Sequence, residues 1–250
     1  MNMVALAASA AVGGAIAAAS WATVWPRSSF WGPVRYRAAD NASGFALTFD
    51  DGPARNSSAA VLDLLGELKV PATFFVIGVN ARACPELLVR MHNEGHLIAN
   101  HSLDHDHMGM FRGRRYWDRQ IVETNNIIEQ AIGRKPAMFR PPMGAKTWSA
   151  MGAAAAQGQA VITWSRRAGD GIATTPRRIL ERLVPRTAKG DILLLHDGVE
   201  PNSRRDPATT ITALKPLILA LRDRGLAPLP LDHLLHLPAY ATPRTKAGVA

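Results

Sequence analysis

Short runs of apolar residues alternate along the chain with longer segments whose apolar positions repeat at helical spacing. The short runs predict six strands, over residues 45–50, 72–78, 96–102, 138–142, 160–165 and 191–197, and a weaker seventh over 226–231. Helices are predicted between them, over residues 57–68, 85–94, 115–132, 147–157, 176–186 and 207–224. In the last helix, Pro216 predicts a break or a restart.

Strands that alternate with helices are typical of an α/β protein with a largely parallel sheet. The run Ile-Leu-Leu-Leu at 192–195 has no polar position, which indicates a strand buried on both faces. The pattern favours a closed or nearly closed β/α barrel, with an open doubly wound sheet as the alternative. We expect a single barrel domain over residues 44–238, preceded by a connector over 26–43 and followed by a tail over 239–250.

The segment 1–25 contains no charged side chain and is dominated by alanine. It is long enough to cross a bilayer, which takes about 20 apolar residues. Three interpretations stay open: a secretory signal peptide, an uncleaved membrane anchor, or an N-terminal apolar helix of a soluble protein. We expect export or anchoring, with membrane association through residues 1–25, whereas the side of the membrane that the barrel faces stays open.

The charge and the cysteine content limit the classes of partner and of metal site. The formal net charge is +9 and the sequence pI is near 10.4, which favours polyanionic neighbours. The basic residues are scattered in short pairs, without a basic helix or an aromatic basic stripe, so we expect no nucleic-acid partner. Cys84 is the single cysteine, which excludes an intrachain disulfide and every cysteine-rich zinc motif. Histidines and carboxylates would therefore have to hold any metal ion.

Polar residues gather where the predicted strands end. Asp-Asp-Gly at 50–52 ends the first strand, His-Ser-Leu-Asp-His at 101–105 the third, and Arg-Pro-Pro-Met-Gly at 140–144 the fourth. Asp170 lies just past the fifth strand, and His196 ends the sixth. Because β/α barrels gather their active sites at the carboxyl ends of their strands, the sequence predicts an active site there.

His101 and His105 are four residues apart, so a helical turn or a tight loop would direct both imidazoles at one point. With one carboxylate they would form a His₂Asp site that keeps a metal position open for water and substrate, as catalytic zinc requires. Two loop histidines that only hydrogen-bond are the alternative. His107 is expected to face solvent.

Asp50 and Asp51 end a buried strand, where their charge needs a compensating cation or arginine. Neighbouring side chains of an extended strand point to opposite faces, so we expect the two acids to differ in role. One would bind the metal and the other would act as a base. A helix cap or an Asx turn before Pro53 is the alternative for an isolated acidic pair.

Together these blocks resemble the polysaccharide deacetylases of the NodB-homology type, carbohydrate esterase family 4. The resemblance covers about residues 44–235 and implies a distorted (β/α)7-type barrel. Thr-Phe-Asp-Asp-Gly at 48–52 is similar to the first family motif, which implies Asp50 as general base and Asp51 as metal ligand. The block at 101–105 is similar to the second motif, which implies His101 and His105 as ligands.

The later blocks imply the rest of the catalytic set. The block at 140–144 is similar to the third motif, which implies that Arg140 orients Asp50 and that the backbone N–H of Met143 contributes to an oxyanion hole. Leu-Leu-Leu-His-Asp at 193–197 is similar to the last motif, whose histidine, His196 here, is the general acid.

The fourth motif is where the chain departs from the family pattern, Asp-x-x-Asp-Trp. The sequence has Arg167 in place of the first Asp and Gly171 in place of the Trp. Asp170 remains and is implied to tune His196. Since the Trp helps to wall the substrate groove, the departure affects the expected binding of a sugar chain and leaves the acid–base pair in place.

The resemblance implies a metal-dependent hydrolase that removes N-acetyl groups from an amino-sugar glycan, similar to a chitooligosaccharide or peptidoglycan. The ligand set favours Zn²⁺, with Co²⁺ or Ni²⁺ as substitutes. Three alternatives stay open: a deacetylase of a membrane-lipid-linked amino sugar, an esterase for O-acetyl groups, and a non-catalytic glycan-binding protein on the same scaffold.

Overall fold

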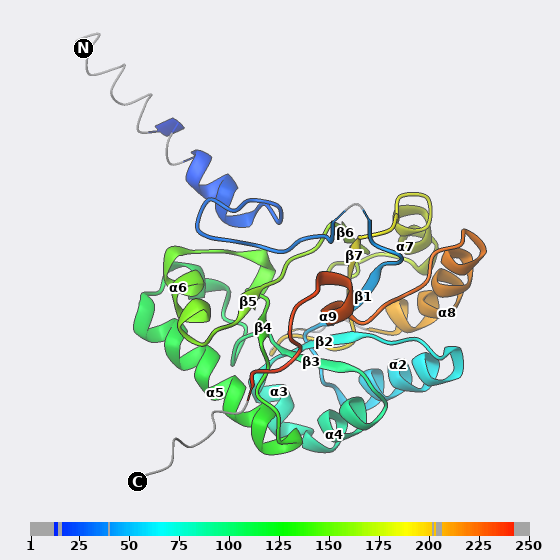
Figure 1. Ribbon diagram of the computed structural model, residues 1–250, viewed down its shortest axis with the longest axis horizontal. Helices are drawn as coiled ribbons and strands as arrows, with labels where there is room; N and C mark the ends of the chain where they lie inside the picture. Colours follow the sequence, from blue (N-terminus) through cyan, green and yellow to red (C-terminus); the bar gives the residue numbers. More distant parts are fainter. Residues whose placement is uncertain (1–12, 15–16, 40, 202, 204–206, 243–250) are drawn as a thin grey trace.

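A parallel sheet positions the predicted site residues. The computed structural model describes residues 13–14, 17–39, 41–201, 203 and 207–242. Within these residues, seven strands pair in parallel in the order β5-β4-β3-β2-β1-β7-β6 (Figure 1). They are β1 (Ala46–Asp50), β2 (Thr73–Val76), β3 (Leu97–Asn100), β4 (Met138–Phe139), β5 (Ala160–Val161), β6 (Arg166–Arg167) and β7 (Ile192–His196).

The two edge strands, β5 and β6, are parts of one extended segment. Because this segment pairs with β4 at one edge of the sheet and with β7 at the other, the sheet is curled. Ile162 N–H donates to the carbonyl of Phe139 in β4 at 2.9 Å, and Ser165 N–H donates to the carbonyl of Ile192 in β7 at 3.1 Å. Arg35 of the connector forms a β-bridge with Ile162, at the point where the segment stops pairing with β4 and has not yet reached β7. The prediction of a distorted (β/α)7-type barrel is confirmed, and the open doubly wound sheet is not formed.

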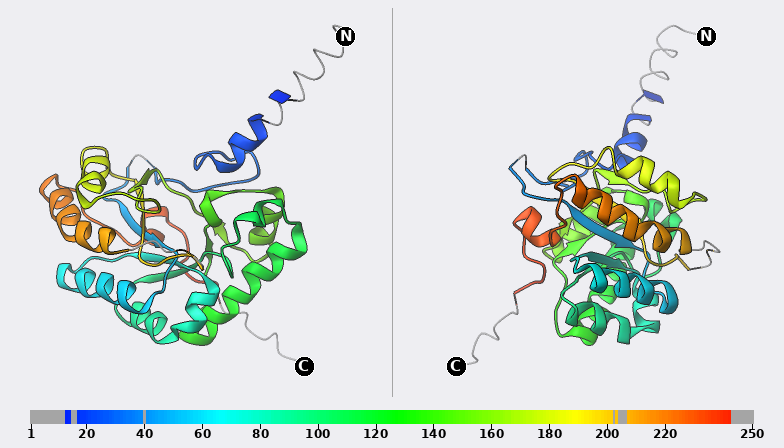
Figure 2. Two further views of the ribbon diagram at one scale, coloured as in Figure 1. Left: turned by 180° about the vertical axis from the view of Figure 1, so that it is seen from behind. Right: turned by 90° about the vertical axis from the view of Figure 1, so that its right-hand side faces the viewer.

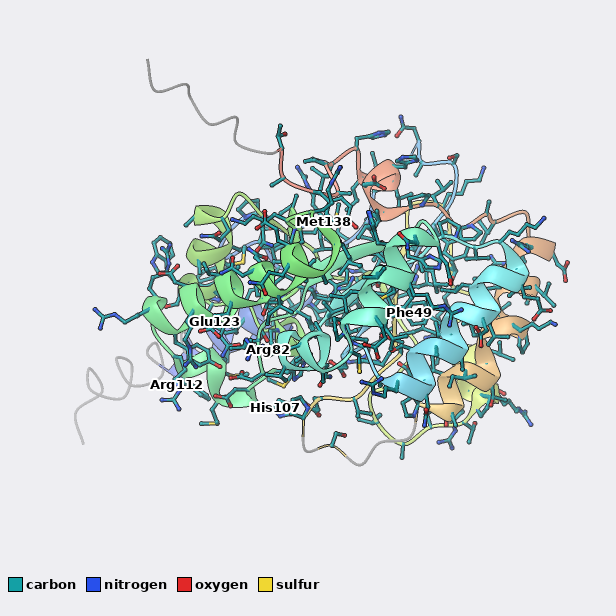
Figure 3. The ribbon with its side chains drawn as sticks, turned by 90° about the horizontal axis from the view of Figure 1, so that it is seen from below. Phe49, Arg82, His107, Arg112, Glu123 and Met138 are labelled. Atoms are coloured by element: carbon teal, nitrogen blue, oxygen red, sulfur yellow. The ribbon has the colours of Figure 1, made fainter. Side chains whose placement is uncertain are left out.

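Helices cover the outside of the curled sheet (Figures 1 and 2). They are α2 (Arg55–Leu68), α3 (Gly78–Ala83), α4 (Pro85–Asn93), α5 (Arg114–Ile132), α6 (Trp148–Ala156), α7 (Pro176–Leu183) and α8 (Ala208–Asp223). The short helix α9 (Leu231–Leu235) instead packs against the other face of the sheet, and two 3-10 turns are present, η1 (His107–Phe111) and η2 (Pro142–Gly144). The largest apolar cluster lies between the sheet and α2, α4, α7 and α8. Phe49, labelled in Figure 3, stacks there on Phe74 with ring centroids 5.3 Å apart.

The ends of the six predicted long helices lie within three residues of those observed. The break predicted at Pro216 is wrong, because α8 continues through it. Pro216 is exposed, so water can hydrate the carbonyl that its missing N–H leaves without a helical donor. Burial of Leu214, Leu217 and Leu221 holds the two halves of the helix against the core.

The weaker strand predicted over 226–231 is also wrong. It makes one isolated bridge, between Phe45 and Pro228, and α9 begins at Leu231. Pro228 and Pro230 have no N–H to donate, so the segment cannot extend a hydrogen-bonded ladder. The seventh strand is β6 instead, in the region where the sequence indicated only a loop.

The N-terminal part of the described chain is helical over residues 17–24 and docks on the barrel (Figure 1). The fully buried Lys146 donates through Nζ to the carbonyl of Trp25 at 2.9 Å, and Thr163 Oγ1 donates to the carbonyl of Pro26 at 2.6 Å. Burial lowers the pKa of Lys146 to about 8. Among the described residues, none of the helices combines the length and apolar character that a membrane crossing needs. Most of the segment 1–25 lies outside the described residues, so its prediction as signal or anchor, and the other domain limits, stay predictions.

Candidate active site

One pocket of about 670 Å³ lies at the carboxyl ends of the strands. Six of the residues that line it lie at the ends of β1 and β7 or in the loops that follow β1, β3 and β4: Asp50, Asp51, His101, His105, Met143 and His196. Arg140 and Asp170 contact two of these residues from behind. The structure therefore brings all eight sequence-predicted site residues to one place.

The acidic pair reaches the pocket through a turn and not through strand alternation. β1 ends at Asp50, and Asp51 adopts a left-handed φ of 72°. Both carboxylates consequently line the same pocket, so the predicted orientation toward opposite faces is wrong. The turn is tight at Gly52, where a Cβ would lie 2.2 Å from an oxygen of Asp197, so only glycine fits.

A tight loop after β3 directs the two imidazoles. Ser102 and His105 both have positive φ, 71° and 54°. The side chain of Asn100 accepts from Ser102 N–H at 2.8 Å, and Gln120 Oε1 accepts from Leu103 N–H at 2.7 Å. These side chains satisfy backbone donors that a helical turn would have used, and they hold the loop in its shape.

The histidine pair and Asp51 form a cluster whose chemistry fits a divalent metal ion. Nε2 of His101 and Nε2 of His105 each lie 3.5 Å from Asp51 Oδ1, and the three ligand atoms are within 4.8 Å of one another. His101 Nδ1 lies 2.7 Å from the carbonyl oxygen of Arg140, which can only accept, so Nδ1 carries the proton and Nε2 presents its lone pair. Burial acts to raise the pKa of Asp51, but the neighbouring imidazoles of His101, His196 and His105 hold this pKa well below its usual range.

Glu200 completes the surroundings of His105 and was missed by the sequence analysis. Its Oε2 lies 3.0 Å from His105 Nδ1, and the same oxygen contacts His107 Nε2. The close contacts with the imidazoles of His105 and His107 outweigh burial and lower the pKa of Glu200. His107 is largely exposed, as expected, and lies at the periphery of the molecule in Figure 3. No motif marks Glu200, because it contacts His105 only through the fold.

Arg140 is wholly buried beneath Asp50. Its Nη1 donates to Asp50 Oδ1 at 2.6 Å and to Thr48 Oγ1 at 2.9 Å, and its Nη2 donates to the carbonyl of Thr163 at 3.1 Å. The guanidinium carbon lies 3.9 Å from the centroid of the Phe75 ring. This arrangement fixes one oxygen of Asp50 and leaves the other directed toward the pocket.

His196 is held on the far side of the pocket by Asp170. Its Nδ1 lies 2.9 Å from Asp170 Oδ1, and its backbone N–H donates to Asp170 Oδ2 at 2.9 Å. Thr210 on α8, a second residue missed from the sequence, donates to the same Oδ2 at 2.7 Å. Burial acts to lower the pKa of His196, but the negative charge of Asp170 outweighs it, so the pKa is raised.

The backbone at Met143 is shaped to face the pocket. Met143 has φ 54° within η2, and its N–H makes no backbone hydrogen bond within the described part of the chain. The residue is 40 % exposed and lines the pocket wall.

The residues that depart from the fourth family motif also line this pocket. Arg167 belongs to β6, and a Cβ on Gly171 would lie 3.2 Å from Cε1 of His196. The imidazole of His196 is therefore flanked by a small residue, and the neighbouring wall is cationic.

A family model described as polysaccharide deacetylase matches residues 38–162. A chitooligosaccharide deacetylase of Sinorhizobium fredii is 37% identical over 207 residues, which cover 79% of this chain and 95% of that protein. The chain belongs to the polysaccharide deacetylase family.

Two further comparisons agree with this membership. A peptidoglycan-N-acetylglucosamine deacetylase of Bacillus cereus is 31% identical over 196 residues, which cover 78% of this chain and 89% of the relative. The crystal structure of a peptidoglycan N-acetylglucosamine deacetylase, in complex with 4-naphthalen-1-yl-N-oxidanyl-benzamide, superimposes with a TM-score of 0.77 at 26% identity, covering 83% of this chain and 95% of that one. The family and the barrel predicted from the sequence are both confirmed.

Proposed function

We propose that this chain is a metal-dependent hydrolase that removes N-acetyl groups from an amino-sugar glycan. The observation that carries the proposal is the shared pocket, in which the ligand cluster of Asp51, His101 and His105 lies between Asp50 and His196. The named activities of the relatives from Sinorhizobium fredii and Bacillus cereus support the same reaction and glycan class.

Asp51, His101 and His105 would hold the cation, which when bound supplies Lewis-acid polarisation of the amide carbonyl and activates water. Two imidazoles and one carboxylate favour Zn²⁺, and Co²⁺ would be accepted by the same donors. Glu200 beside His105 and the carbonyl of Arg140 beside His101 orient the ligand rings.

Asp50 and Met143 act on the attacking side of the reaction. Asp50, fixed by Arg140, accepts a proton from water as the water attacks the acyl carbon. The N–H of Met143 donates to the oxyanion that develops on the former carbonyl oxygen, an interaction typically worth about 3–4 kcal/mol.

His196 acts on the leaving side. Departure of the amine requires a proton on its nitrogen, and the protonated imidazole of His196 supplies that proton. Asp170 raises the fraction of His196 that is protonated and fixes the ring through Nδ1, so that Nε2 faces the pocket.

Acetate release from N-acetylated chitooligosaccharides and peptidoglycan fragments tests the proposal. Release is expected in the presence of Zn²⁺ or Co²⁺, loss is expected with a chelator, and Asp50→Asn serves as the inactive control. Glycan retention without chelator-sensitive release would instead favour the non-catalytic alternative. Release from O-acetylated substrates alone would favour the esterase.

Asp170→Asn is expected to move the alkaline limb of the activity profile to lower pH. His196 must be protonated to act as an acid, so activity falls as pH rises through its pKa, and loss of the Asp170 charge lowers that pKa. The pH dependence of kcat is the measurement. Asp118→Asn, an exposed acid on α5, should leave the limb in place. An unmoved limb in Asp170→Asn contradicts the assigned role of Asp170.

Glu200→Gln is expected to weaken metal binding by about 10–100-fold, which is typical when a group that orients a ligand histidine is lost. Glutamine keeps an acceptor for His105 Nδ1 and removes the charge that polarises the ring. Titration of metal-free protein against a competing chelator measures the change. Glu181→Gln, on the exposed face of α7, is the matched control. Unchanged affinity in Glu200→Gln would show that Glu200 does not act through His105.

Export or membrane anchoring through residues 1–25 remains part of the proposal. The exposed aromatic side chains of Trp21, Trp25 and Phe30 support an interfacial position next to that segment. Fractionation of cells that express the full chain, compared with a chain beginning at residue 26, tests this association. Equal recovery of both chains in the soluble fraction contradicts it.

A further inference from the structure

The wall of the pocket beside His196 carries four arginines, Arg166, Arg167, Arg182 and Arg186, which we call the arginine wall. We infer that the arginine wall binds a phosphate group on the amino-sugar substrate. The inference rests on the proposed deacetylase function and narrows its substrate to a phosphorylated amino sugar.

The position of the arginine wall suits a group next to the reacting amide. Arg167 in β6 pairs in register with Leu194 of β7, and His196 follows two residues later on β7. Two residues of a strand span about 7 Å. The backbone of Arg167 therefore lies on the strand next to that of His196, about 7 Å before the level of His196 along the strand direction. A group bound by Arg167 would therefore belong to the same sugar as the acetamide, or to an atom linked directly to that sugar.

The charge of the arginine wall is only partly compensated within the protein. Arg166 donates through Nε to Asp191 at 3.0 Å, and Asp191 also accepts from Ser165 Oγ at 2.7 Å. Arg167, Arg182 and Arg186 make no ion pair with an acidic side chain anywhere in the described residues. Three cationic groups beside one pocket match a doubly charged phosphate better than a neutral sugar.

One of these arginines has a second task. Arg182 Nη1 donates to the carbonyl of Ala168 at 2.9 Å and to Thr174 Oγ1 at 3.3 Å, which holds the loop that carries Asp170. Arg167 and Arg186 are exposed, and within the described part of the chain their side chains make no hydrogen bond to the protein. These two are therefore the residues able to reach a ligand, and Arg182 is unsuitable for a binding test.

Two departures from the family pattern both favour the binding of a phosphate group in this part of the pocket. Arginine at 167 replaces the acid of the pattern, which changes the charge at this wall by two units, and Gly171 leaves the space beside His196 that a large aromatic side chain would take. The rim next to this space is apolar, with Ile172 71 % exposed. The phosphate source is either a soluble sugar phosphate or a lipid-linked one, whose apolar chain would pass this rim.

A binding measurement tests the inference without requiring turnover. In zinc-loaded Asp50→Asn protein, N-acetylglucosamine 1-phosphate is expected to bind at least about tenfold more tightly than methyl N-acetylglucosaminide. Arg167→Gln and Arg186→Gln should each remove about tenfold of phosphate affinity, and the gap should shrink with added salt. Arg178 is an exposed arginine of α7 outside the pocket, and Arg178→Gln should leave the phosphate affinity unchanged. Equal binding of the two sugars, or a gap that survives both pocket variants, overturns the inference.

Turnover by the unmodified enzyme separates the sources. Faster acetate release from N-acetylglucosamine 1-phosphate assigns a soluble substrate, and faster release from a polyprenyl-phosphate-linked N-acetylglucosamine in detergent micelles assigns a lipid headgroup. Neutral chitooligosaccharides that react at least as fast as both overturn the inference while upholding the proposed function. If no substrate releases acetate, the proposed function fails, and the binding comparison still decides whether the arginine wall recognises phosphate.

Discussion

Replacing His196 by alanine is expected to lower acetate release by about 10²–10⁴-fold while the metal remains bound. The amine cannot leave without a proton. Of the other described imidazoles that line the pocket, His101 and His105 belong to the ligand cluster and His107 is held by Glu200 beside His105. His196 Nε2 is 4.0 Å from the nearest oxygen of Asp51 and is not a member of the ligand cluster. Loss of the ring therefore removes the acid and leaves the cluster intact.

Acetate release and metal content should be measured on the same preparation of His196→Ala. His233→Ala, which removes a largely exposed imidazole of α9, is the matched control and should change neither quantity. A loss of metal from His196→Ala in proportion to its loss of activity would assign His196 to the ligands and overturn its role as acid.

Arg140→Met is expected to destabilise the metal-free protein by about 3–5 kcal/mol, the usual cost of removing one partner of a buried ion pair. Methionine keeps much of the apolar stem, but Asp50 and Thr48, which are both almost fully buried, lose their common donor. For a chain of this size, each kcal/mol lowers Tm by about 2–4 °C, so a decrease of about 10 °C is expected. Activity should fall as well, because Asp50 loses the contact that fixes its carboxylate.

A double-mutant cycle with Asp50→Asn distinguishes this cause from simple loss of packing. Arg140→Met should cost less stability in Asp50→Asn protein than in the unmodified protein, because asparagine at position 50 carries no charge to leave uncompensated. Arg114→Met breaks an exposed pair with Asp118 and should cost less than about 1 kcal/mol. An equal cost in both proteins would mean that the guanidinium acts through packing on Phe75 and not through its charge.

Local patterns were sufficient for the long elements. Apolar periodicity placed the six long helices because each buries one face on the sheet, and that face repeats within a few turns. The same reasoning failed for short elements. β6 has two residues and both are arginine, so neither apolar character nor length marks it as a strand.

For the site, too, some features follow from local sequence and others only from the tertiary structure. The sequence by itself determined the family, the barrel and the types of side chain at the strand ends, because motif spacing and residue chemistry are local properties. Only the tertiary structure decided that Glu200 lies against His105, that Thr210 holds Asp170, and that four arginines share one wall. These partners come from separate elements, and their distances depend on sheet register and helix packing, which no spacing along the chain encodes.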